Sequence, residues 1–282
     1  MTSPDFLVIG HVAKDIVPGG WRLGGTAAYA SIQAGRLGLK TAVLTSAPGS
    51  IDLATLLPGV EVHRVPSRQP TTFRNCYQDG RRTQFLLARA RPLALADVPK
   101  TWLSASIVLL GPLCGEVPPE TTSLFARSLV GIAAQGWLRG VDDSEQRVIA
   151  SQWPESNAWA SVHALFVSED DLAGDNSALD RWTAAFPVVA YTQASRGARL
   201  HAGGLWRHID AFPEREVDPT GAGDVFAASF LTRLHETGDL SLAARFAAAA
   251  ASISVSREGT LAIPDRRQIE QRMAQHPEIV LR

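Results

Sequence analysis

Short apolar runs alternate along this chain with longer segments in which apolar residues recur at helical spacing. Continuous apolar runs bounded by glycine or polar residues are typical of strands buried on both faces, as in a parallel sheet. The predicted strands are residues 6–10, 41–46, 107–111, 164–168 and 188–193, and the predicted helices are residues 26–38, 224–238, 241–256 and 265–273. The alternation predicts an α/β fold with a mostly parallel central sheet, and we expect residues 1–282 to form a single domain.

Residues 60–90 depart from this alternation, because they contain extended segments on either side of Asp79-Gly80. Asp-Gly between two extended segments is a strong signal for a hairpin turn. Such a hairpin would form either a flap over the ligand site or an extension of the sheet edge, and the pattern favours neither. The sequence therefore predicts a small β flap at about residues 60–90. A flap this short would leave a sheet edge with which a second copy could pair to form a homodimer.

Composition excludes several classes of function. The formal net charge is −1, from 27 Lys and Arg against 28 Asp and Glu, and the positive charges are not clustered. A chain without a basic patch is not expected to bind nucleic acid or an anionic membrane surface. No segment approaches the roughly 20 apolar residues of a membrane-spanning helix. With only two cysteines, Cys76 and Cys114, at no metal-type spacing, we expect a cytoplasmic protein with reduced thiols.

The stretch VDPTGAGDVFAASFLTRL, residues 217–234, carries the clearest chemistry. A helix that begins near Gly223 leaves its first N–H groups free, and Gly221, Ala222 and Gly223 would let a phosphate approach them as an anion hole. Asp224 would repel that phosphate, but it is suited to take a proton from an attacking hydroxyl. The alternative is that the glycines form a tight turn and that Asp218 and Asp224 cap the helix.

The motif DPTGAGDVFAASF closely resembles the C-terminal signature of the ribokinase-like (PfkB) carbohydrate kinases. LGGTAAYASIQAGRLG, VIGHVAKDIV and RFAAAAASISVSREGTLAIP are similar to further family motifs in the same order. The resemblance implies a three-layer α/β/α domain, ATP and Mg²⁺ as cofactors, and Asp224 as the catalytic base beside the Gly221–Gly223 anion hole. The short segment between Asp15 and Gly24 implies that the β-hairpin lid is reduced to residues 60–90.

The same resemblance implies the binding residues. Asp15, Gly24, Gly25 and Thr26 would bind the acceptor, with the Asp15 carboxylate accepting hydrogen bonds from its hydroxyl groups. The nucleotide would lie against four further positions, which are Thr192, Gly197, Thr220 and Ala248.

Two departures from the family pattern concern cations. The Asn-x-x-Glu motif that relatives use for magnesium and phosphate appears here as SEDD, which leaves Asp171 as the metal-linked candidate and Ser168 in place of the asparagine. The loop after Gly259 is one residue shorter than in ribokinase, so a K⁺ site is uncertain.

The acceptor is the least specified part of the prediction. GPLCGEV and QGWLR look like the branch that contains myo-inositol kinases, which favours a small polyol such as a cyclitol or sugar. The alternatives are a nucleoside kinase of the same family and a sugar-binding regulatory protein without catalysis.

Overall fold

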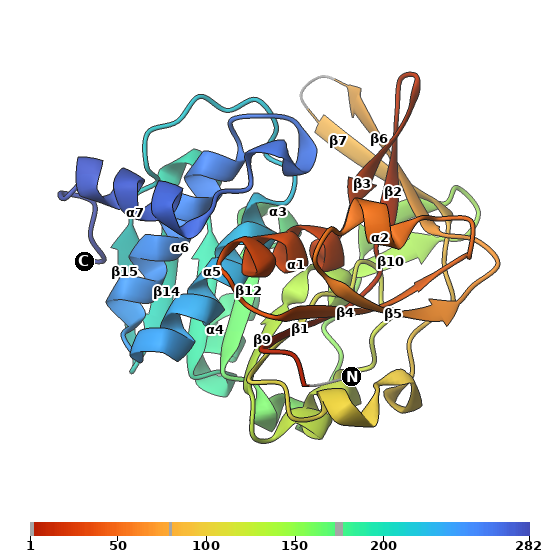
Figure 1. Cartoon of the computed structure of the whole chain (residues 1–282), viewed down its shortest axis with the longest axis horizontal. Coiled ribbons are helices and arrows are strands. Elements are labelled where there is room, and N and C mark those ends of the chain that lie inside the picture. Colours follow the sequence, from red (N-terminus) through yellow and green to blue (C-terminus); the bar gives the residue numbers. More distant parts are fainter. Residues whose placement is uncertain (1–2, 79–80, 173–176) are drawn as a thin grey trace.

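The structure, a computed structural model, describes residues 3–78, 81–172 and 177–282. Its centre is a nine-stranded sheet in the order β15-β14-β13-β12-β9-β8-β1-β4-β5 (Figure 1). The strands are β1 (Phe6–Ile9), β4 (Thr41–Ala47), β5 (Glu61–Pro66), β8 (Ile107–Leu110), β9 (Leu129–Ala133), β12 (Ala164–Ser168), β13 (Val188–Thr192), β14 (Ala198–Ala202) and β15 (Leu205–Ile209). The seven strands β13, β12, β9, β8, β1, β4 and β5 run parallel to one another, and β14 pairs antiparallel with both β13 and β15. The predicted parallel sheet is therefore confirmed.

Helices cover both faces of this sheet, as the predicted three-layer arrangement requires. The helices are α1 (Thr26–Arg36), α2 (Leu53–Leu56), α3 (Glu169–Leu172), α4 (Ser177–Ala185), α5 (Ala222–Thr237), α6 (Leu240–Ser254) and α7 (Arg266–Gln275). In β1, Phe6 and Val8 pack in the cluster that contains α1, α5 and α6, while Leu7 and Ile9 pack in the cluster on the other face. Successive side chains of a strand point to opposite faces, so a wholly apolar run is the expected sequence for a strand between two layers.

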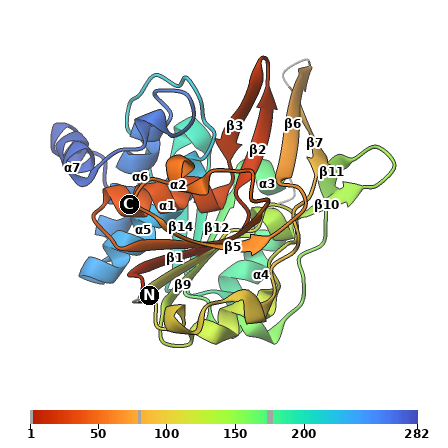
Figure 2. The ribbon, with the colours of Figure 1, turned by 45° about the vertical axis from the view of Figure 1, so that its right-hand side comes forward.

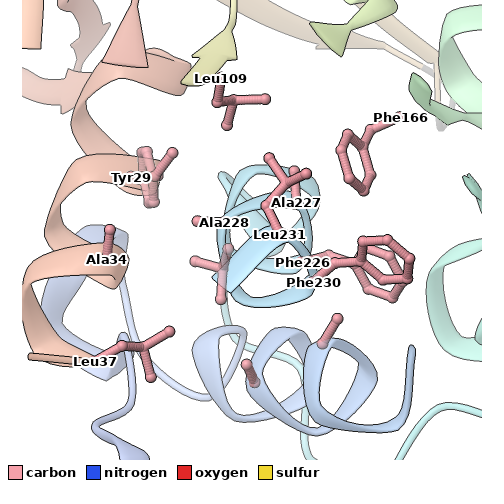
Figure 3. Close-up of a cluster of buried hydrophobic side chains, with 14 of the residues drawn as sticks. Tyr29, Ala34, Leu37, Leu109, Phe166, Phe226, Ala227, Ala228, Phe230 and Leu231 are labelled. Carbon is pink, nitrogen blue, oxygen red and sulfur yellow. The ribbon is translucent and has the colours of Figure 1, made fainter. Parts of the chain in front are cut away.

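Side chains of α1 and α5 pack together in one buried apolar cluster (Figure 3). Tyr29 of α1 and Phe226 and Phe230 of α5 are buried together with Phe166 of β12. The rings of Phe226 and Phe230 stack at 6.1 Å, and Phe166 meets Phe230 edge-on at 5.6 Å. Aromatic packing of this kind fixes where the first turn of α5 lies relative to the sheet and α1.

A second sheet of six strands, here called the lid sheet, stands apart from the first in the order β10-β11-β7-β6-β2-β3 (Figures 1 and 2). Its strands are β2 (Ala13–Val17), β3 (Gly20–Gly24), β6 (Thr71–Gln78), β7 (Arg81–Ala88), β10 (Arg139–Asp142) and β11 (Arg147–Ala150).

The prediction of a reduced lid is therefore wrong. The β6–β7 hairpin is one part of a larger sheet, and β5, at the start of the predicted flap, belongs to the central sheet instead. The short segment around Asp15 forms a hairpin of two five-residue strands, β2 and β3, that pairs with β6. The Asp79-Gly80 turn itself lies outside the described residues.

Candidate active site

The first turn of α5 requires glycine at one position and leaves space at another. Gly221 precedes the helix in the left-handed conformation, with φ of 78°, and a Cβ there would lie 2.1 Å from the Tyr29 ring. Only glycine tolerates both conditions. A Cβ on Gly223 would instead project into open space. The start of α5 therefore packs closely against Tyr29 at Gly221, whereas free space adjoins it at Gly223.

Backbone N–H groups at this helix start are available to an anion. The Ala222 N–H donates to the carbonyl of Pro219 at 3.2 Å. Within the described part of the chain, the N–H groups of Gly223 and Asp224 have no hydrogen-bond partner. Free N–H groups and the helix dipole together favour a bound phosphate. The N–H of Ala222, which the sequence placed in the anion hole, is therefore not available to a phosphate, because it already donates to Pro219.

Asp224 lies half-buried in this first turn. Burial raises its pKa to about 6 from the ordinary value of 3.8, and the nearby Asp171 carboxylate acts in the same direction. A hydrogen bond from the Thr26 hydroxyl and the charge of Arg139 oppose this rise. A carboxylate with a pKa close to the working pH is a suitable general base.

Thr26 connects the two helix starts. It is the first residue of α1, its side chain is buried with 2% exposure, and its hydroxyl donates to Asp224. The sequence placed Thr26 among the acceptor-binding residues, whereas the structure places it against the proposed base.

Asp171 is surrounded by hydrogen-bond donors. Its carboxylate accepts from the N–H and hydroxyl of Ser168 at 3.0 and 2.6 Å and from the amide of Gln135 at 3.2 Å. The guanidinium of Arg139 lies 3.8 Å from the same carboxylate. Among the described residues, no group of three or more Asp, Glu, His or Cys side chains could hold a metal. The geometry does not favour direct coordination by Asp171, since its oxygens are already occupied.

The acceptor candidates lie where the lid sheet joins the central sheet. The Asp15 side chain on β2 lies against Gly24 on β3, where a Cβ would come within 2.2 Å of a carboxylate oxygen. Gly25 directly precedes α1 with φ of 93°, and a Cβ there would lie 2.6 Å from the carbonyl of His11. Both glycines are thus needed for the close approach of β2, β3 and α1.

Tyr29 marks the point at which three carboxylates gather. Burial raises the pKa of its hydroxyl, and the negative charges of Asp218, Asp15 and Asp224 raise it further. Asp15 and Asp224, which lie near opposite ends of the sequence, therefore both act on the ionisation of one hydroxyl. The predicted acceptor-binding residue and the predicted base thus both act electrostatically on Tyr29.

Asp218 links the lid sheet to the loops below it. Its carboxylate accepts from the N–H groups of Thr220 at 3.0 Å and Gly259 at 2.9 Å. Arg22 of β3 lies 3.7 Å from Asp218 and 2.9 Å from Glu258. Although burial alone would raise the pKa of Asp218, hydrogen bonds from Thr220 and Gly259 hold it below the ordinary value.

A cavity of about 330 Å³ opens beside the start of α5. Among the residues that line it are Thr192, Gly197, Phe212, Gly223, Ala248 and Val255. Its charged lining residues are Glu214 and Glu216, and no Lys or Arg of the described chain lines it. Three of the four predicted nucleotide positions line this cavity. The fourth, Thr220, is exposed and does not line it, although its neighbour Pro219 does.

Sequence reasoning missed Tyr29 and Arg139 as parts of the site. Tyr29 stands in an ordinary amphipathic helix, and its position against Gly221 depends on the packing of α1 on α5. Arg139 belongs to the QGWLR segment, which suggested only an acceptor class. The only sequence feature that pointed to Arg139 was its position directly after an apolar strand and a turn. Arginines at such positions are frequent on protein surfaces, so the feature was not specific.

Comparison with known proteins finds similarity to carbohydrate kinases. The family model described as pfkB family carbohydrate kinase matches residues 144–266. Ribokinase from Bacillus subtilis (strain 168) is 40% identical over 90 residues, which cover 31% of this chain and 31% of that protein. Inositol 3-kinase from Oryza sativa subsp. japonica is 27% identical over 254 residues, which cover 81% of this chain and 62% of that protein. The chain thus spans less than two thirds of the length of these curated relatives.

One solved structure agrees over nearly the whole chain. It is a pyrophosphate-dependent kinase in the ribokinase family, complexed with a pyrophosphate analogue and myo-inositol. The TM-score is 0.78 at 25% identity, and the match covers 94% of this chain and 99% of the other. No helix in the described ranges is long and apolar enough to span a membrane.

Proposed function

We propose, from the premise that this chain belongs to the ribokinase-like (PfkB) family of carbohydrate kinases, that it transfers the γ-phosphoryl group of ATP to a hydroxyl of a small polyol. The polyol would be a sugar or a cyclitol such as myo-inositol. The observation that carries this proposal is the start of α5, where Asp224 and two free N–H groups stand together at the edge of the cavity.

The proposed mechanism follows from the roles of these groups. The carboxylate of Asp224 accepts the proton of the acceptor hydroxyl, whose oxygen attacks the γ-phosphorus while the bond to the β-phosphate oxygen breaks. The N–H groups of Gly223 and Asp224 donate to the phosphoryl oxygens, where negative charge is held during transfer. The Thr26 hydroxyl fixes the orientation of the Asp224 carboxylate.

The lining of the cavity supports ATP as the donor. Phe212, Ala248 and Val255 give it apolar walls that suit an adenine ring, and its volume of about 330 Å³ is typical of small-ligand pockets. A cavity for pyrophosphate alone would require basic side chains, whereas the charged residues here are glutamates. We therefore favour ATP over pyrophosphate, although a similar solved kinase depends on pyrophosphate.

Mg²⁺ would enter with the nucleotide, because this ion commonly binds through substrate phosphates and keeps several waters. When bound, it would neutralise phosphate charge. Asp171 would act on such an ion only through water or through its effect on Asp224, since Ser168, Gln135 and Arg139 occupy its carboxylate.

An acceptor and donor panel tests the proposed function. Release of ADP would be measured with Mg²⁺ and ATP for myo-inositol, ribose, fructose, adenosine and cytidine, with and without KCl. The same acceptors would be tested with pyrophosphate, followed by phosphate release. We expect turnover with ATP and one polyol, and a loss of about 10²- to 10⁴-fold in Asp224→Asn. Turnover with pyrophosphate alone would refute the donor assignment, and a nucleoside as the preferred acceptor would refute the polyol class.

A further inference from the structure

The chain passes from the central sheet into the lid sheet through residues 10–12, which connect β1 to β2. The backbone of this connection is bonded to the central-sheet side. The His11 N–H donates to the carboxylate of Glu116, in the loop after β8, at 3.2 Å. The Val12 N–H donates to the hydroxyl of Thr45, in β4, at 2.8 Å. The connection is therefore fixed relative to the central sheet before β2 begins.

The side chain of His11 contacts the lid side and is fully buried, with 0% exposure. Its Nδ1 lies 2.7 Å from the hydroxyl of Thr71, the first residue of β6. Its Nε2 lies 3.0 Å from the carbonyl oxygen of Arg91, three residues after β7. The Thr71 hydroxyl also accepts from the N–H of Ala90 at 3.1 Å. One imidazole thus joins three of the points at which the chain passes between the two sheets.

For a neutral ring, these partners permit one arrangement of hydrogens. The Arg91 carbonyl can only accept, so Nε2 of His11 carries the hydrogen. Nδ1 is then an acceptor, and the Thr71 hydroxyl donates to it while accepting from Ala90. Burial lowers the pKa of His11 below its ordinary value of 6.5, although the nearby Glu116 carboxylate opposes this. The ring is therefore neutral at pH 7, as this arrangement requires.

The bond between His11 and Thr71 lies at the start of the β2–β6 pair. This parallel pair is short, with four residue pairs, and Asp15 is in register with Phe73, two residues beyond Thr71. A shift of register by one residue moves a side chain to the other face of a strand, so the position of the Asp15 carboxylate depends on this register. His11 and Thr71 are both buried, so neither contacts an acceptor itself. Any effect of their bond on the acceptor must pass through Asp15.

We propose that His11 is a positioning residue for phosphoryl transfer: its imidazole, hydrogen-bonded to Thr71, fixes the register of β2 on β6 and so holds Asp15 at the acceptor. This inference rests on the proposed function and on the predicted role of Asp15 in acceptor binding. The cavity beside α5 is lined by none of these three residues. Loss of the bond should therefore weaken acceptor binding and leave nucleotide binding unchanged.

Thr71→Val and Thr71→Ser test the bond. Valine keeps the shape of threonine without the hydroxyl, whereas serine keeps the hydroxyl. Initial rates would give the KM for ATP and the KM for the polyol that the acceptor panel selects from myo-inositol, ribose and fructose. We expect the KM for the polyol to rise about 10- to 100-fold in Thr71→Val while the KM for ATP is unchanged. In Thr71→Ser both values should stay close to those of the wild type.

Thr72→Val is the matched control. Thr72 is the next residue of β6, and its hydroxyl donates to the carbonyl of Pro70 in its own segment at 3.2 Å. The same substitution there removes a hydroxyl without removing the bond to His11. The KM for the polyol should therefore equal that of the wild type.

Nitrogen-15 NMR of protein labelled at its seven histidines observes the bond itself. At pH 7 the His11 signals should be those of a neutral ring with its hydrogen on Nε2. One histidine Nδ1 signal should shift in Thr71→Val and remain unshifted in Thr72→Val. If no histidine signal responds to Thr71→Val alone, the bond does not form and the inference is wrong.

Each kinetic outcome bears on a separate statement. If the KM for the polyol is the same in Thr71→Val as in the wild type, the bond does not position Asp15 and the inference is wrong. It is also wrong if both KM values are unchanged and only the rate per mole of protein falls, because the variant has then merely lost folded protein. An equal rise in both KM values would refute it in the same way. If the wild type turns over none of the polyols, the proposed function fails first and takes the inference with it.

Discussion

Replacing Asp224 by asparagine should make the folded chain more stable at pH 7 while it removes activity. Burial raises the pKa of Asp224 to about 6 from 3.8, so folding holds the ionised carboxylate in a place that disfavours its charge. One pKa unit corresponds to about 1.4 kcal/mol, so a rise of about two units costs at most about 3 kcal/mol at pH 7. Asparagine has the same shape without the charge, and it can still accept the hydrogen bond of Thr26. We expect a gain of about 2 kcal/mol.

The sign of the pH dependence follows from the same shift. Because the folded-state pKa lies above the unfolded-state value, the folded wild type binds a proton more readily, and this group's contribution to stability rises as pH falls from 7 through about 6 toward 4. The stability difference between Asp224→Asn and the wild type should therefore shrink over that range. Urea unfolding of both proteins at pH 7.5, 6 and 5 would measure it.

Asp218→Asn is the control with the opposite sign. The pKa of Asp218 is lowered, because hydrogen bonds from Thr220 and Gly259 outweigh its burial. Its ionised form stabilises the fold above the unfolded pKa, so the asparagine variant should be less stable at pH 7. The reasoning is refuted if Asp224→Asn is no more stable than the wild type at pH 7, or if its advantage is the same at every pH.

Three further predictions concern the same site. The kcat/KM for the acceptor should fall as pH decreases through about 6, the pKa of Asp224, because the base must be ionised. Arg139→Met should shift this acidic fall in kcat/KM to higher pH, because the charge of Arg139 lowers the pKa of Asp224. An unchanged pH profile would show that Arg139 does not act on the base. Gly221→Ala should lower the free energy of unfolding by at least about 1–3 kcal/mol, because the backbone has φ of 78° and the new Cβ would also clash with the Tyr29 ring. An unchanged urea midpoint would contradict this. Ala251→Leu should fill part of the cavity and raise the KM for ATP about tenfold without changing acceptor affinity, and an unchanged KM would refute the adenine assignment.

The central sheet and the start of α5 could be predicted from the sequence because each is encoded locally. A strand buried on both faces is apolar throughout, as β1 and β8 are, and this pattern needs no knowledge of the neighbouring strands. Likewise, a glycine directly before an apolar helical run indicates where α5 begins, and this signal does not depend on what the helix packs against.

The lid sheet could not be predicted because its strands depend on one another. Strands β2 and β3 are short, partly exposed and carry charged residues, so neither has the apolar alternation of an independent strand. They are stabilised by pairing with each other and with β6, across about 50 residues of intervening chain. The short gap between Asp15 and Gly24 led to the prediction that the lid is reduced to residues 60–90, whereas two five-residue strands form there.

The environment of Asp224 depends on tertiary contacts in the same way. Thr26, Asp171 and Arg139 come from three distant segments, and each changes the pKa of Asp224 by its position in space. Asp171 is the clearest example of a residue whose environment could not be predicted from the sequence. Its place in the SEDD motif suggested a metal ligand, whereas the donors that occupy it come partly from Gln135 and Arg139, outside that motif.

Phosphorus NMR of one reaction mixture tests the central claim most directly. Wild-type protein, Mg²⁺, ATP and the polyol preferred in the acceptor panel would be followed in time, with Asp224→Asn in a parallel sample. The account predicts a new phosphomonoester resonance that grows in equal amount with ADP in the wild type and is absent from the variant on the same timescale. Release of inorganic phosphate without a phosphomonoester, or equal product formation by Asp224→Asn, would contradict it.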